Sequence, residues 1–428
     1  MNAQEVIDAI HGVYGLGNKV GLRNINALMD ALCPDRKVPV IHVAGTNGKG
    51  SVCAMLESIL RRAGYRTGLY TSPFLQAYPE RVRLDGAPLS DGLLTRYGAA
   101  VLEVSQHLEA EAGCRATCFE LGTALAASVF EGEGVDVAVM EVGLGGRLDP
   151  TNFVRPMVCA ITAIGLDHMK VLGDTLPSIA AEKAGIIKPG VPVVCHPASA
   201  EVAEVFARTA DRVGAPLRQM RRDMLLAAEG DAYGSIITCQ VGETIWRDVR
   251  LGLSGRHQWT NALTALGVVE ELRRQGYVLS DEAVRQGMAR VVWPARLEWQ
   301  GNILIDGAHN PQGVAALSDF VREHLAGRRR VLLTGVLEDK LQPDMLSALA
   351  SLAEDAVTVT PDSPRAMEAG RLAVLLNHHG DCRAQAAPSL RAGIEQARVL
   401  AGKDGVIIAA GSLYFAGSLR TLLGLPWR

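Results

Sequence analysis

VPVIHVAGTNGKGSVCAMLESILRRAG, residues 38–64, is the stretch that decides the fold. An apolar run leads into the glycine-rich loop GTNGKGS, and a helical pattern begins directly after it. A phosphate-binding loop requires this order, because glycines let backbone N–H groups turn toward an anion. Lys49 supplies positive charge for β- and γ-phosphates, and the hydroxyl of Thr46 or Ser51 can reach a phosphate or its metal ion. The stretch therefore predicts a nucleotide-binding loop at residues 45–51.

The predicted loop is a shortened variant of the common G-x-x-x-x-G-K-S/T pattern. That pattern would need glycine where Val43 stands and a hydroxyl where Gly50 stands. The alternative is a glycine-rich turn that only connects a strand to a helix. Such a turn would leave Lys49 without a use, so we favour the phosphate loop.

Apolar runs like the one before the loop recur and alternate with helix-length amphipathic segments. The early runs span 38–44, 66–72, 135–142, 157–164 and 191–196. Runs of this kind are typical of buried parallel strands joined by crossover helices. The alternation restarts from Leu297. The sequence therefore predicts an α/β protein in two domains. We expect a phosphate-loop-type, doubly wound, mainly parallel sheet domain at 1–295, followed by a smaller Rossmann-like α/β domain at 296–428.

Two intervals depart from this alternation. Residues 73–92 combine prolines, charges and Gly86 without a clear period, which predicts a long ordered loop. Residues 215–255 hold short alternating pieces, which predict a small antiparallel patch before a helix near Thr260.

The composition limits the classes of function. The 428 residues include 43 basic and 46 acidic side chains, a net charge of −3, so no global positive field would hold a nucleic acid or an anionic membrane. The eight cysteines are scattered without a C-x-x-C pair, which favours reduced thiols in the cytoplasm. No basic leader and no apolar run of about 18 residues is present, so we expect neither export nor a membrane span.

Chemically useful residues follow the other apolar runs. Ser72, Glu141 and His168 each come at or just after the end of a predicted strand. Ligands of open parallel sheets sit beyond these strand ends, so the three side chains should share the crevice with the loop. Such a group can hold one or two Mg²⁺ ions, or Mn²⁺ in their place. Each residue also has a structural alternative: Glu141 could pair with Arg147, and His168 could be an ordinary loop histidine.

Nine segments, taken together, resemble folylpolyglutamate synthase and its bifunctional relative dihydrofolate synthase, within the Mur ligase superfamily. They lie in register over positions 42–417, which makes chance resemblance very improbable. They are HVAGTNGKGS (42–51), LYTSPF (69–74), EVGLGGRLDPTN (141–152), LDHMKVLG (166–173), EKAGIIKPG (182–190), GRHQWTNA (255–262), WPARLE (293–298), DGAHNP (306–311) and GSLYFAG (411–417).

The resemblance implies a set of nucleotide and metal ligands. Ser72 and Glu141 would hold one Mg²⁺, and Glu141, His168 and a carbamylated Lys183 a second. Carbamylation turns a cation into an oxygen ligand, which fits a site beside divalent ions; otherwise Lys183 would be a solvated helix lysine. The implied catalytic residues are Lys49, Glu141, His168, Lys183 and His309. The implied ATP-binding residues are Gly45, Thr46, Asn47, Gly48, Lys49, Gly50, Ser51, Asn261, Arg296 and Asp306.

The resemblance also implies substrate pockets. The pterin pocket would comprise Thr117, Cys118, Phe119, Glu120, Leu148, Asp149 and Pro150. A flat ring can stack on Phe119, and a carboxylate of Asp149 or Glu120 can accept hydrogen bonds from its amino-pyrimidine edge. Asp306, His309 and Ser412 would lie near the incoming glutamate. Many relatives have histidine where Phe74 stands, so a polar contact is missing there, and the segment 18–24 loosely matches a dihydropteroate-binding segment.

The predicted function is an ATP-dependent ligase. It would phosphorylate a pterin or folate carboxylate and join L-glutamate to the acyl phosphate, with dihydropteroate, tetrahydrofolate or both as acceptors. Two alternatives stay open at this point: a Mur-type amino-acid ligase of cell-wall precursors, and a regulatory phosphate-loop NTPase. The family implies a monomer. The sequence leaves open whether both glutamate additions occur, the length and linkage of the polyglutamate, and whether Lys183 is carbamylated.

Overall fold

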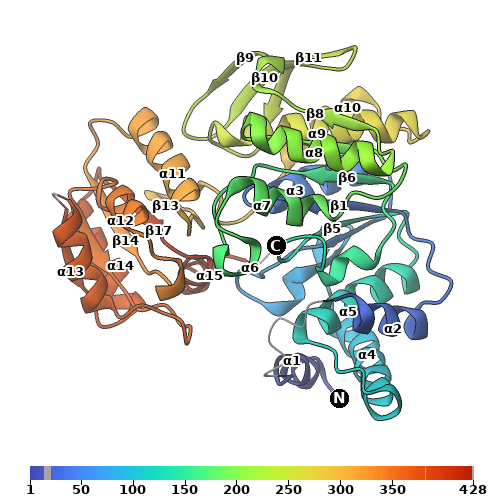
Figure 1. Ribbon diagram of the computed structural model, residues 1–428. Coiled ribbons are helices and arrows are strands. Elements are labelled where there is room, and N and C mark those ends of the chain that lie inside the picture. Colours follow the sequence, from blue (N-terminus) through green and yellow to red (C-terminus); the bar gives the residue numbers. More distant parts are fainter. Residues whose placement is uncertain (14–20, 381, 427–428) are drawn as a thin grey trace.

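A computed structural model describes residues 1–13, 21–380 and 382–426 (Figure 1). Within these residues the strands form three sheets, of eight, three and six strands. The first two sheets and their helices make up a first lobe, and the third makes up a second lobe, drawn in orange and red at the left of Figure 1. The predicted α/β fold class is confirmed. Residues 18–20 of the segment matched to dihydropteroate binding lie outside the described residues.

The large sheet of the first lobe has the order β4-β3-β2-β5-β1-β6-β7-β8. The six strands from β2 to β8 run parallel, and the predicted apolar runs form its buried centre. The strands are β1 (Val40–Ala44), β2 (Thr67–Tyr70), β3 (Val82–Leu84), β4 (Ala87–Pro88), β5 (Val137–Glu141), β6 (Val158–Ile161), β7 (Val193–Cys195) and β8 (Leu217–Gln219).

The prediction of a loop at residues 73–92 is wrong in part. A 3₁₀ turn, η1 (Tyr78–Arg81), leads into β3, which pairs antiparallel with β2, and β4 then pairs with β3. Strands of two and three residues are too short to show a period of two among prolines and charges. This hairpin extends the large sheet beside the end of β2, next to Ser72.

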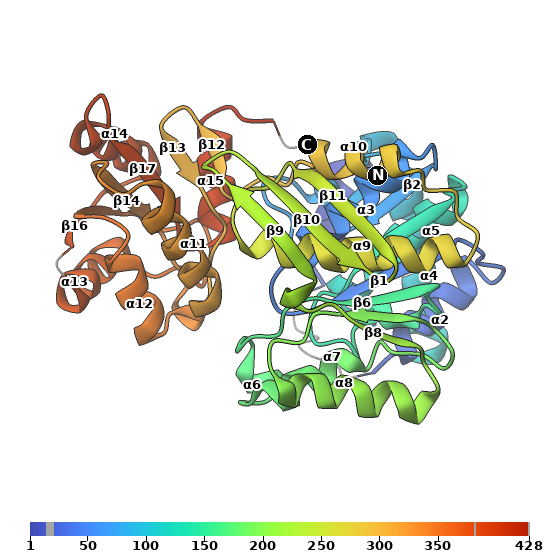
Figure 2. The ribbon, with the colours of Figure 1, turned by 90° about the horizontal axis from the view of Figure 1, so that it is seen from above.

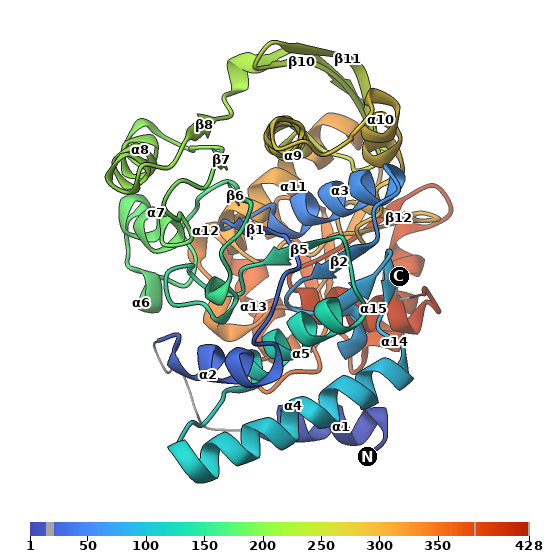
Figure 3. The same ribbon diagram turned by 90° about the vertical axis from the view of Figure 1, so that its right-hand side faces the viewer.

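A layer of helices separates the large sheet from the three-stranded sheet, as Figure 3 shows. The layer consists of α3 (Lys49–Arg62), α9 (His257–Arg274) and α10 (Asp281–Arg290). The three-stranded sheet has the order β11-β10-β9 and is antiparallel, as predicted. Its strands are β9 (Leu225–Gly230), β10 (Ser235–Val241) and β11 (Thr244–Leu251). One buried cluster joins all three layers, so α3 is held on both sides.

Helices also cover the opposite face of the large sheet. Figure 2 shows α7 and α8 beside β6 and β8, while α1, α2, α4 and α5 pack toward the β2 side in a cluster of their own. They are α1 (Ala3–His11), α2 (Arg23–Leu32), α4 (Asp91–Ala112), α5 (Cys118–Gly132), α7 (Leu176–Ala184) and α8 (Ala200–Val213), with the short α6 (Met169–Leu172) and the 3₁₀ turns η2 (Pro150–Phe153) and η3 (Arg222–Met224).

The second lobe is also doubly wound. Its sheet has the order β12-β13-β17-β14-β15-β16, and only β12 is antiparallel to its neighbour. Helices α11 to α13 pack on one face and α14 and α15 on the other. The strands are β12 (Glu298–Gln300), β13 (Ile303–Ile305), β14 (Arg330–Thr334), β15 (Asp355–Thr358), β16 (Arg383–Ala386) and β17 (Val406–Ala410). The helices are α11 (Pro311–His324), α12 (Pro343–Ala350), α13 (Ala369–His379), α14 (Leu390–Ala401) and α15 (Leu413–Leu422), with the turn η4 (Glu338–Lys340).

None of the described helices is both long enough and apolar enough to cross a membrane.

The contact between α3 and α10 depends on Gly287. A Cβ there would lie 2.6 Å from Ile59 Cα and 2.7 Å from Ile59 N, and Ser58 Oγ donates to Gly287 O at 2.8 Å. The obstacle is backbone, which cannot rotate away. We expect Gly287→Ala to lower the free energy of unfolding by about 1–3 kcal/mol, measured by urea denaturation, because the two helices must separate.

Gly92→Ala is the matched control, because Gly92 is also a helical glycine but a Cβ there meets nothing within 4 Å. Alanine at an open helical position should leave the protein unchanged or stabilise it by up to about 1 kcal/mol. Equal stability of both variants would contradict this account of the helix contact.

Candidate active site

The predicted phosphate loop, residues 45–51, follows β1, and its last three residues form the start of α3, which begins at Lys49. The chain that follows β6 holds the loop from one side. The backbone N–H groups of Thr46 and Asn47 donate to Ala163 O at 2.9 and 3.3 Å. The strand, loop and helix thus stand in the order that a phosphate-binding loop requires.

Two glycines of the loop are required by close contacts. Gly45 has φ of +148° and Gly48 has φ of +88°, both in the region that favours glycine. A Cβ at Gly45 would lie 1.8 Å from Thr162 Oγ1, and one at Gly48 would lie 2.2 Å from Asn261 Oδ1. The sequence motif therefore depends on one neighbour directly after β6 and on one from α9.

The start of α9 packs on the loop and the start of α3. Asn261 Nδ2 donates to Gln258 Oε1 at 2.9 Å, and Gln258 Nε2 donates to Ser51 Oγ at 3.3 Å. Trp293 closes the same place, since a Cβ at Gly50 would lie 2.7 Å from the indole Nε1. Sequence reasoning found Asn261 but missed Gln258 and Trp293. Both stand inside segments that carried the family resemblance, which was the only signal for them.

Glu141 ends β5, which pairs with β1, the strand that leads into the phosphate loop. The carboxylate is only 5% exposed, and its Oε2 accepts a hydrogen bond from Ser72 N at 3.2 Å. Burial raises the pKa of Glu141, while the charge of Lys49 and this hydrogen bond oppose the rise. The alternative pairing with Arg147 does not form, because that side chain bonds Glu182 instead, at 2.9 Å.

Lys183, on α7, is a buried basic group whose pKa is affected by the charge of Lys49. Its side chain is 5% exposed. Burial, followed by the charge of Lys49, lowers the pKa of Lys183 to about 7. The amine is thus partly neutral near pH 7, unlike that of a solvated helix lysine.

His168 precedes α6 in a left-handed conformation, with φ of +51°. Burial lowers the pKa of His168, and the charges of Lys49 and Lys183 are among the further causes. The same Lys49 charge lowers the pKa of Glu141, His168 and Lys183, so the structure gathers these predicted residues around one amine.

In the part of the chain that the structure describes, no three or more His, Cys, Asp or Glu side chains form a metal-binding group. Glu141 and His168 alone would leave a divalent ion short of protein ligands. A complete set at this place needs oxygen donors from other residue types, such as Ser72 and a modified Lys183.

The predicted pterin residues around α5 divide into two kinds. Thr117 and Glu120 form a capping box: Thr117 N donates to Glu120 Oε2 at 2.7 Å, and Glu120 N donates to Thr117 Oγ1 at 3.2 Å. Cys118 and Phe119 are half-buried, and the ring of Phe119 lies 6.1 Å from that of Tyr70. The carboxylate of Glu120 thus has a structural use that the sequence did not predict.

Asp149 is engaged in a similar way. Its carboxylate accepts hydrogen bonds from Leu144 N at 2.8 Å, Thr151 N at 3.0 Å and Thr151 Oγ1 at 2.5 Å. The side chain is 3% exposed, and burial raises its pKa. Leu148 and Pro150 beside it remain half-exposed.

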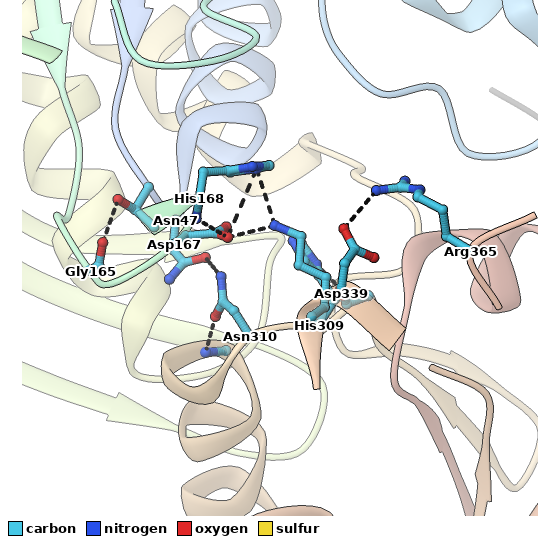
Figure 4. A network of polar contacts seen from close by, with 12 residues as sticks. Asn47, Gly165, Asp167, His168, His309, Asn310, Asp339 and Arg365 are labelled. Atoms are coloured by element: carbon cyan, nitrogen blue, oxygen red, sulfur yellow. Dashed lines mark hydrogen bonds and ion pairs between the residues drawn. The ribbon is translucent and has the colours of Figure 1, made fainter. Parts of the chain in front are cut away.

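The second lobe contacts the phosphate loop directly, as Figure 4 shows. Asn310 Nδ2 donates to Asn47 Oδ1 at 3.0 Å, and Asn47 Nδ2 donates to Gln312 Oε1 at 2.7 Å. Asn310 caps α11, so these bonds tie the start of that helix to the loop. Sequence reasoning missed Asn310 and Gln312, although the first stands in DGAHNP.

Lys340 forms a second contact between the lobes. Its Nζ donates to Asp167 Oδ1 at 2.5 Å and lies 3.1 Å from His168 Nε2. Both side chains of the ion pair are 13% exposed. Burial alone would raise the pKa of Asp167, but the hydrogen bond from Lys340 and the neighbouring positive charges lower it to about 2. No sequence signal singled out Lys340.

Arg296 stands at the junction of the lobes. Its positive charge lowers the pKa of both Glu141 and Asp306, although burial raises the pKa of each. Asp306 accepts hydrogen bonds from Leu297 N at 2.9 Å and Ala308 N at 2.8 Å, so it fixes the chain around the arginine. A cavity between the lobes is lined by Ser72, Glu141, Trp293, Arg296 and Leu413, among others.

His309 and Ser412 are held by local hydrogen bonds. His309 Nδ1 donates to Gly307 O at 2.8 Å, and burial lowers the pKa of His309 to about 4, so its Nε2 is an acceptor at neutral pH. Ser412 is 1% exposed and caps α15, donating to Gly335 O and accepting from Phe415 N. The structure thus gives Ser412 a capping role.

The fold of the two lobes, with the phosphate loop of the first lobe in contact with the second, defines a nucleotide-dependent ligase of the Mur type. The family model "Mur ligase middle domain" matches residues 43–269, and "Mur ligase, glutamate ligase domain" matches residues 295–413. The chain belongs to the folylpolyglutamate synthase and dihydrofolate synthase family of these ligases.

Two curated relatives match over almost their whole length. The chain is 35% identical to dihydrofolate synthase/folylpolyglutamate synthase of Bacillus subtilis, over 98% of this chain and 99% of that protein. It is also 35% identical to folylpolyglutamate synthase of Lacticaseibacillus casei, over 99% of both chains.

Solved structures are similar over the same extent. The folylpolyglutamate synthase of Mycobacterium tuberculosis complexed with ADP has a TM-score of 0.88 and 33% identity, covering 99% of this chain and 100% of that one. E. coli FolC in complex with DHPP and ADP has a TM-score of 0.87 and 29% identity, covering 99% and 98%.

The ion pair of Lys340 and Asp167 generates a pH prediction. The pKa of Asp167 is depressed in the folded protein, so the pair stabilises it above about pH 4, and this contribution is lost as the pH falls toward 2. We expect Lys340→Met to lower the free energy of unfolding at pH 7 by about 1–2 kcal/mol, with the difference shrinking below pH 4. Urea denaturation of both proteins at several pH values, without nucleotide or metal, measures this difference.

Lys403→Met is the control, because Lys403 is an exposed lysine of the second lobe with no ion pair among the described residues. It should cost less than about 0.5 kcal/mol at every pH. A Lys340→Met penalty that did not change with pH would refute the role of this ion pair.

Proposed function

We propose that the protein is an ATP-dependent ligase that joins L-glutamate to the carboxylate of a pterin or folate through an acyl phosphate. The observation that carries this proposal is the placement of Lys49 at the head of α3, surrounded by Glu141, His168 and Lys183. A charge cluster at a phosphate loop suits phosphoryl transfer, in which positioning and electrostatic stabilisation do most of the catalysis. The family of the chain supports the same chemistry.

The roles of the residues follow from their positions. ATP transfers its γ-phosphoryl group to the substrate carboxylate, and the amino group of glutamate then attacks the acyl phosphate to form an amide and release phosphate. Lys49 and the N–H groups at the start of α3 stabilise the negative charge that builds on the phosphoryl group. Arg296 brings a further positive charge from the junction of the lobes. Contacts between Asn47 and Asn310 close the lobes over the site, which excludes water from the acyl phosphate.

The residues present fit a divalent metal site of Mg²⁺ type, with Mn²⁺ as a substitute. Ser72 and Glu141 would hold one ion, and Glu141, His168 and a carbamylated Lys183 a second. The fit rests on the buried, partly neutral amine of Lys183, since a neutral amine is the form that reacts with carbon dioxide. When bound, such ions neutralise phosphate charge and orient the phosphoryl group.

The pterin ring would pack in the first lobe against the half-buried Phe119 and Cys118, with Leu148 and Pro150 nearby. The bound DHPP of the E. coli structure supports a pterin acceptor. We assign residues 1–295 to ATP and pterin binding and residues 296–428 to the glutamate-ligase domain, with Asp306, His309 and Ser412 toward the glutamate. We also propose that the protein acts as a cytoplasmic monomer.

The full-length relatives favour this function over a Mur-type ligase of cell-wall precursors and over a regulatory NTPase. The decisive experiment measures ADP release with MgATP and L-glutamate, comparing dihydropteroate with tetrahydrofolate and confirming each product by mass. Activity with both acceptors establishes a bifunctional enzyme, and activity with one assigns the protein to that step. No ADP release with either, despite ATP binding, would refute the proposed function.

Lys49→Ala and Glu141→Ala test the charge cluster. Each should reduce kcat at least about 100-fold, because phosphoryl transfer loses a charge-stabilising group. Thermal unfolding should show both variants folded. The controls Lys403→Ala and Glu229→Ala remove exposed side chains of the same types and should keep normal turnover. A variant with near-normal turnover would remove that residue from the mechanism.

Carbamylation of Lys183 is tested with carbon dioxide. Removal of dissolved carbon dioxide should lower the activity, and bicarbonate should restore it, because the carbamate forms reversibly on a neutral amine. Intact-mass measurement under native conditions should detect the added carbon dioxide and its absence in Lys183→Ala. A full rate without bicarbonate, together with an unmodified mass, would disprove the modification.

A further inference from the structure

Arg81, at the end of η1, is a positive charge without a counter-ion. Among the described residues, no carboxylate forms an ion pair or hydrogen bond with its guanidinium group, and its buried Nε has no hydrogen-bond partner. The neighbouring Glu80 is turned away, because its carboxylate accepts hydrogen bonds from the backbone N–H groups of residues 75–77, at 3.0, 2.8 and 2.7 Å. An unpaired, partly desolvated cation is costly unless a ligand supplies an anion.

Aromatic rings hold the guanidinium in place. It lies 5.4 Å from the ring centre of Phe74 and 5.7 Å from that of Tyr78. The rings of Phe74 and Tyr78 are 6.1 Å apart, and His11 of α1 packs on both, at 6.3 and 5.2 Å. Cation–π contacts orient an arginine but do not neutralise it. The side chain is therefore preorganised with its charge still available.

Arg81 lies beside the cavity between the lobes. Phe74, whose ring the guanidinium faces, lines that cavity together with Ser72, Glu141 and Arg296. Burial raises the pKa of Glu141 and of Cys118, in the proposed pterin pocket, and the charge of Arg81 opposes both rises. A folate that spans from Cys118 and Phe119 toward Lys49 would pass its glutamate tail by Arg81.

The two candidate acceptors differ in charge at this place. Dihydropteroate has one carboxylate, which is the group that reacts. Tetrahydrofolate ends in a glutamate with two carboxylates, of which one reacts and the other does not. An arginine fork is well suited to bind the carboxylate that does not react.

We propose that Arg81 binds the non-reacting carboxylate of the terminal glutamate of a folate acceptor, and so determines specificity for glutamylated folates over dihydropteroate. This inference rests on the proposed ligase function. It assigns to the 73–92 segment a recognition role that depends on the number of carboxylates on the substrate.

Arg81→Gln tests the proposal, because glutamine keeps a polar side chain but removes the charge. The expected result is a fall in kcat/KM for tetrahydrofolate of roughly 10- to 100-fold, carried mainly by KM, with less than about a threefold change for dihydropteroate. Arg96→Gln is the matched control. Arg96 also stacks on an aromatic ring, Tyr97 at 5.0 Å, but is exposed and lies 3.8 Å from Glu133.

A substrate analogue gives a second, independent readout. One of the two monoamides of tetrahydrofolate keeps the reacting carboxylate and lacks the charge of the other. The wild type should use this monoamide with a kcat/KM lowered by the same roughly 10- to 100-fold factor. Arg81→Gln should lower kcat/KM for this monoamide little further. This cycle works even if the enzyme does not accept dihydropteroate. Unchanged ADP binding and thermal unfolding of the variant would show that its nucleotide site and fold are intact.

Each outcome decides the question. An equal loss with both acceptors, or additive losses from the amide and the variant, would overturn the proposal and assign Arg81 to the reacting group or to the fold. No loss with tetrahydrofolate would also overturn it. Failure of the ligase function itself is recognised separately, because the wild type would then turn over neither acceptor.

Discussion

The positive charge of the half-buried Lys49 is the feature on which the rest of the site depends. It stands at the head of α3, where the helix end and the loop N–H groups already favour an anion. Glu141, His168 and Lys183 come from three other segments, and the same charge lowers the pKa of all three. Without a ligand the charges of this group are incompletely compensated, and two of its members, Glu141 and Lys183, are buried. Phosphates and metal ions would restore that balance.

The scaffold around α3 explains how such a site stays folded. The helix is packed between the large sheet on one side and α9, α10 and the three-stranded sheet on the other, in one buried cluster. Gly287 lets α10 approach α3 at backbone distance, and Gly48 lets Asn261 of α9 approach the loop. These contacts position the loop before any ligand binds, so little ordering has to accompany binding.

The second lobe takes part in the site through a few polar contacts. Asn310 and Gln312 bond to Asn47, and Lys340 bonds to Asp167, so the lobes touch at the loop and beside His168. Small polar junctions of this kind permit relative motion of domains more readily than large apolar ones. This suits an enzyme that must admit three substrates and then exclude water. Arg81 and Arg296 bring further charge to the same space, from the 73–92 segment and from the lobe junction.

The sequence by itself determined the α/β class, the phosphate loop and the family, because these depend on local order: apolar runs, glycines and motifs at fixed spacing. It also predicted Glu141 and His168, since strand ends in a parallel sheet meet at one edge, whereas Lys183 was predicted only through the family resemblance. Only the tertiary structure decided that 73–92 contains a hairpin, that Glu120 and Asp149 are bonded within the chain, and that Lys340 and Arg81 face the site. The physical reason is that burial, charge pairing and backbone approach depend on neighbours far apart in the chain, and no local pattern encodes those neighbours.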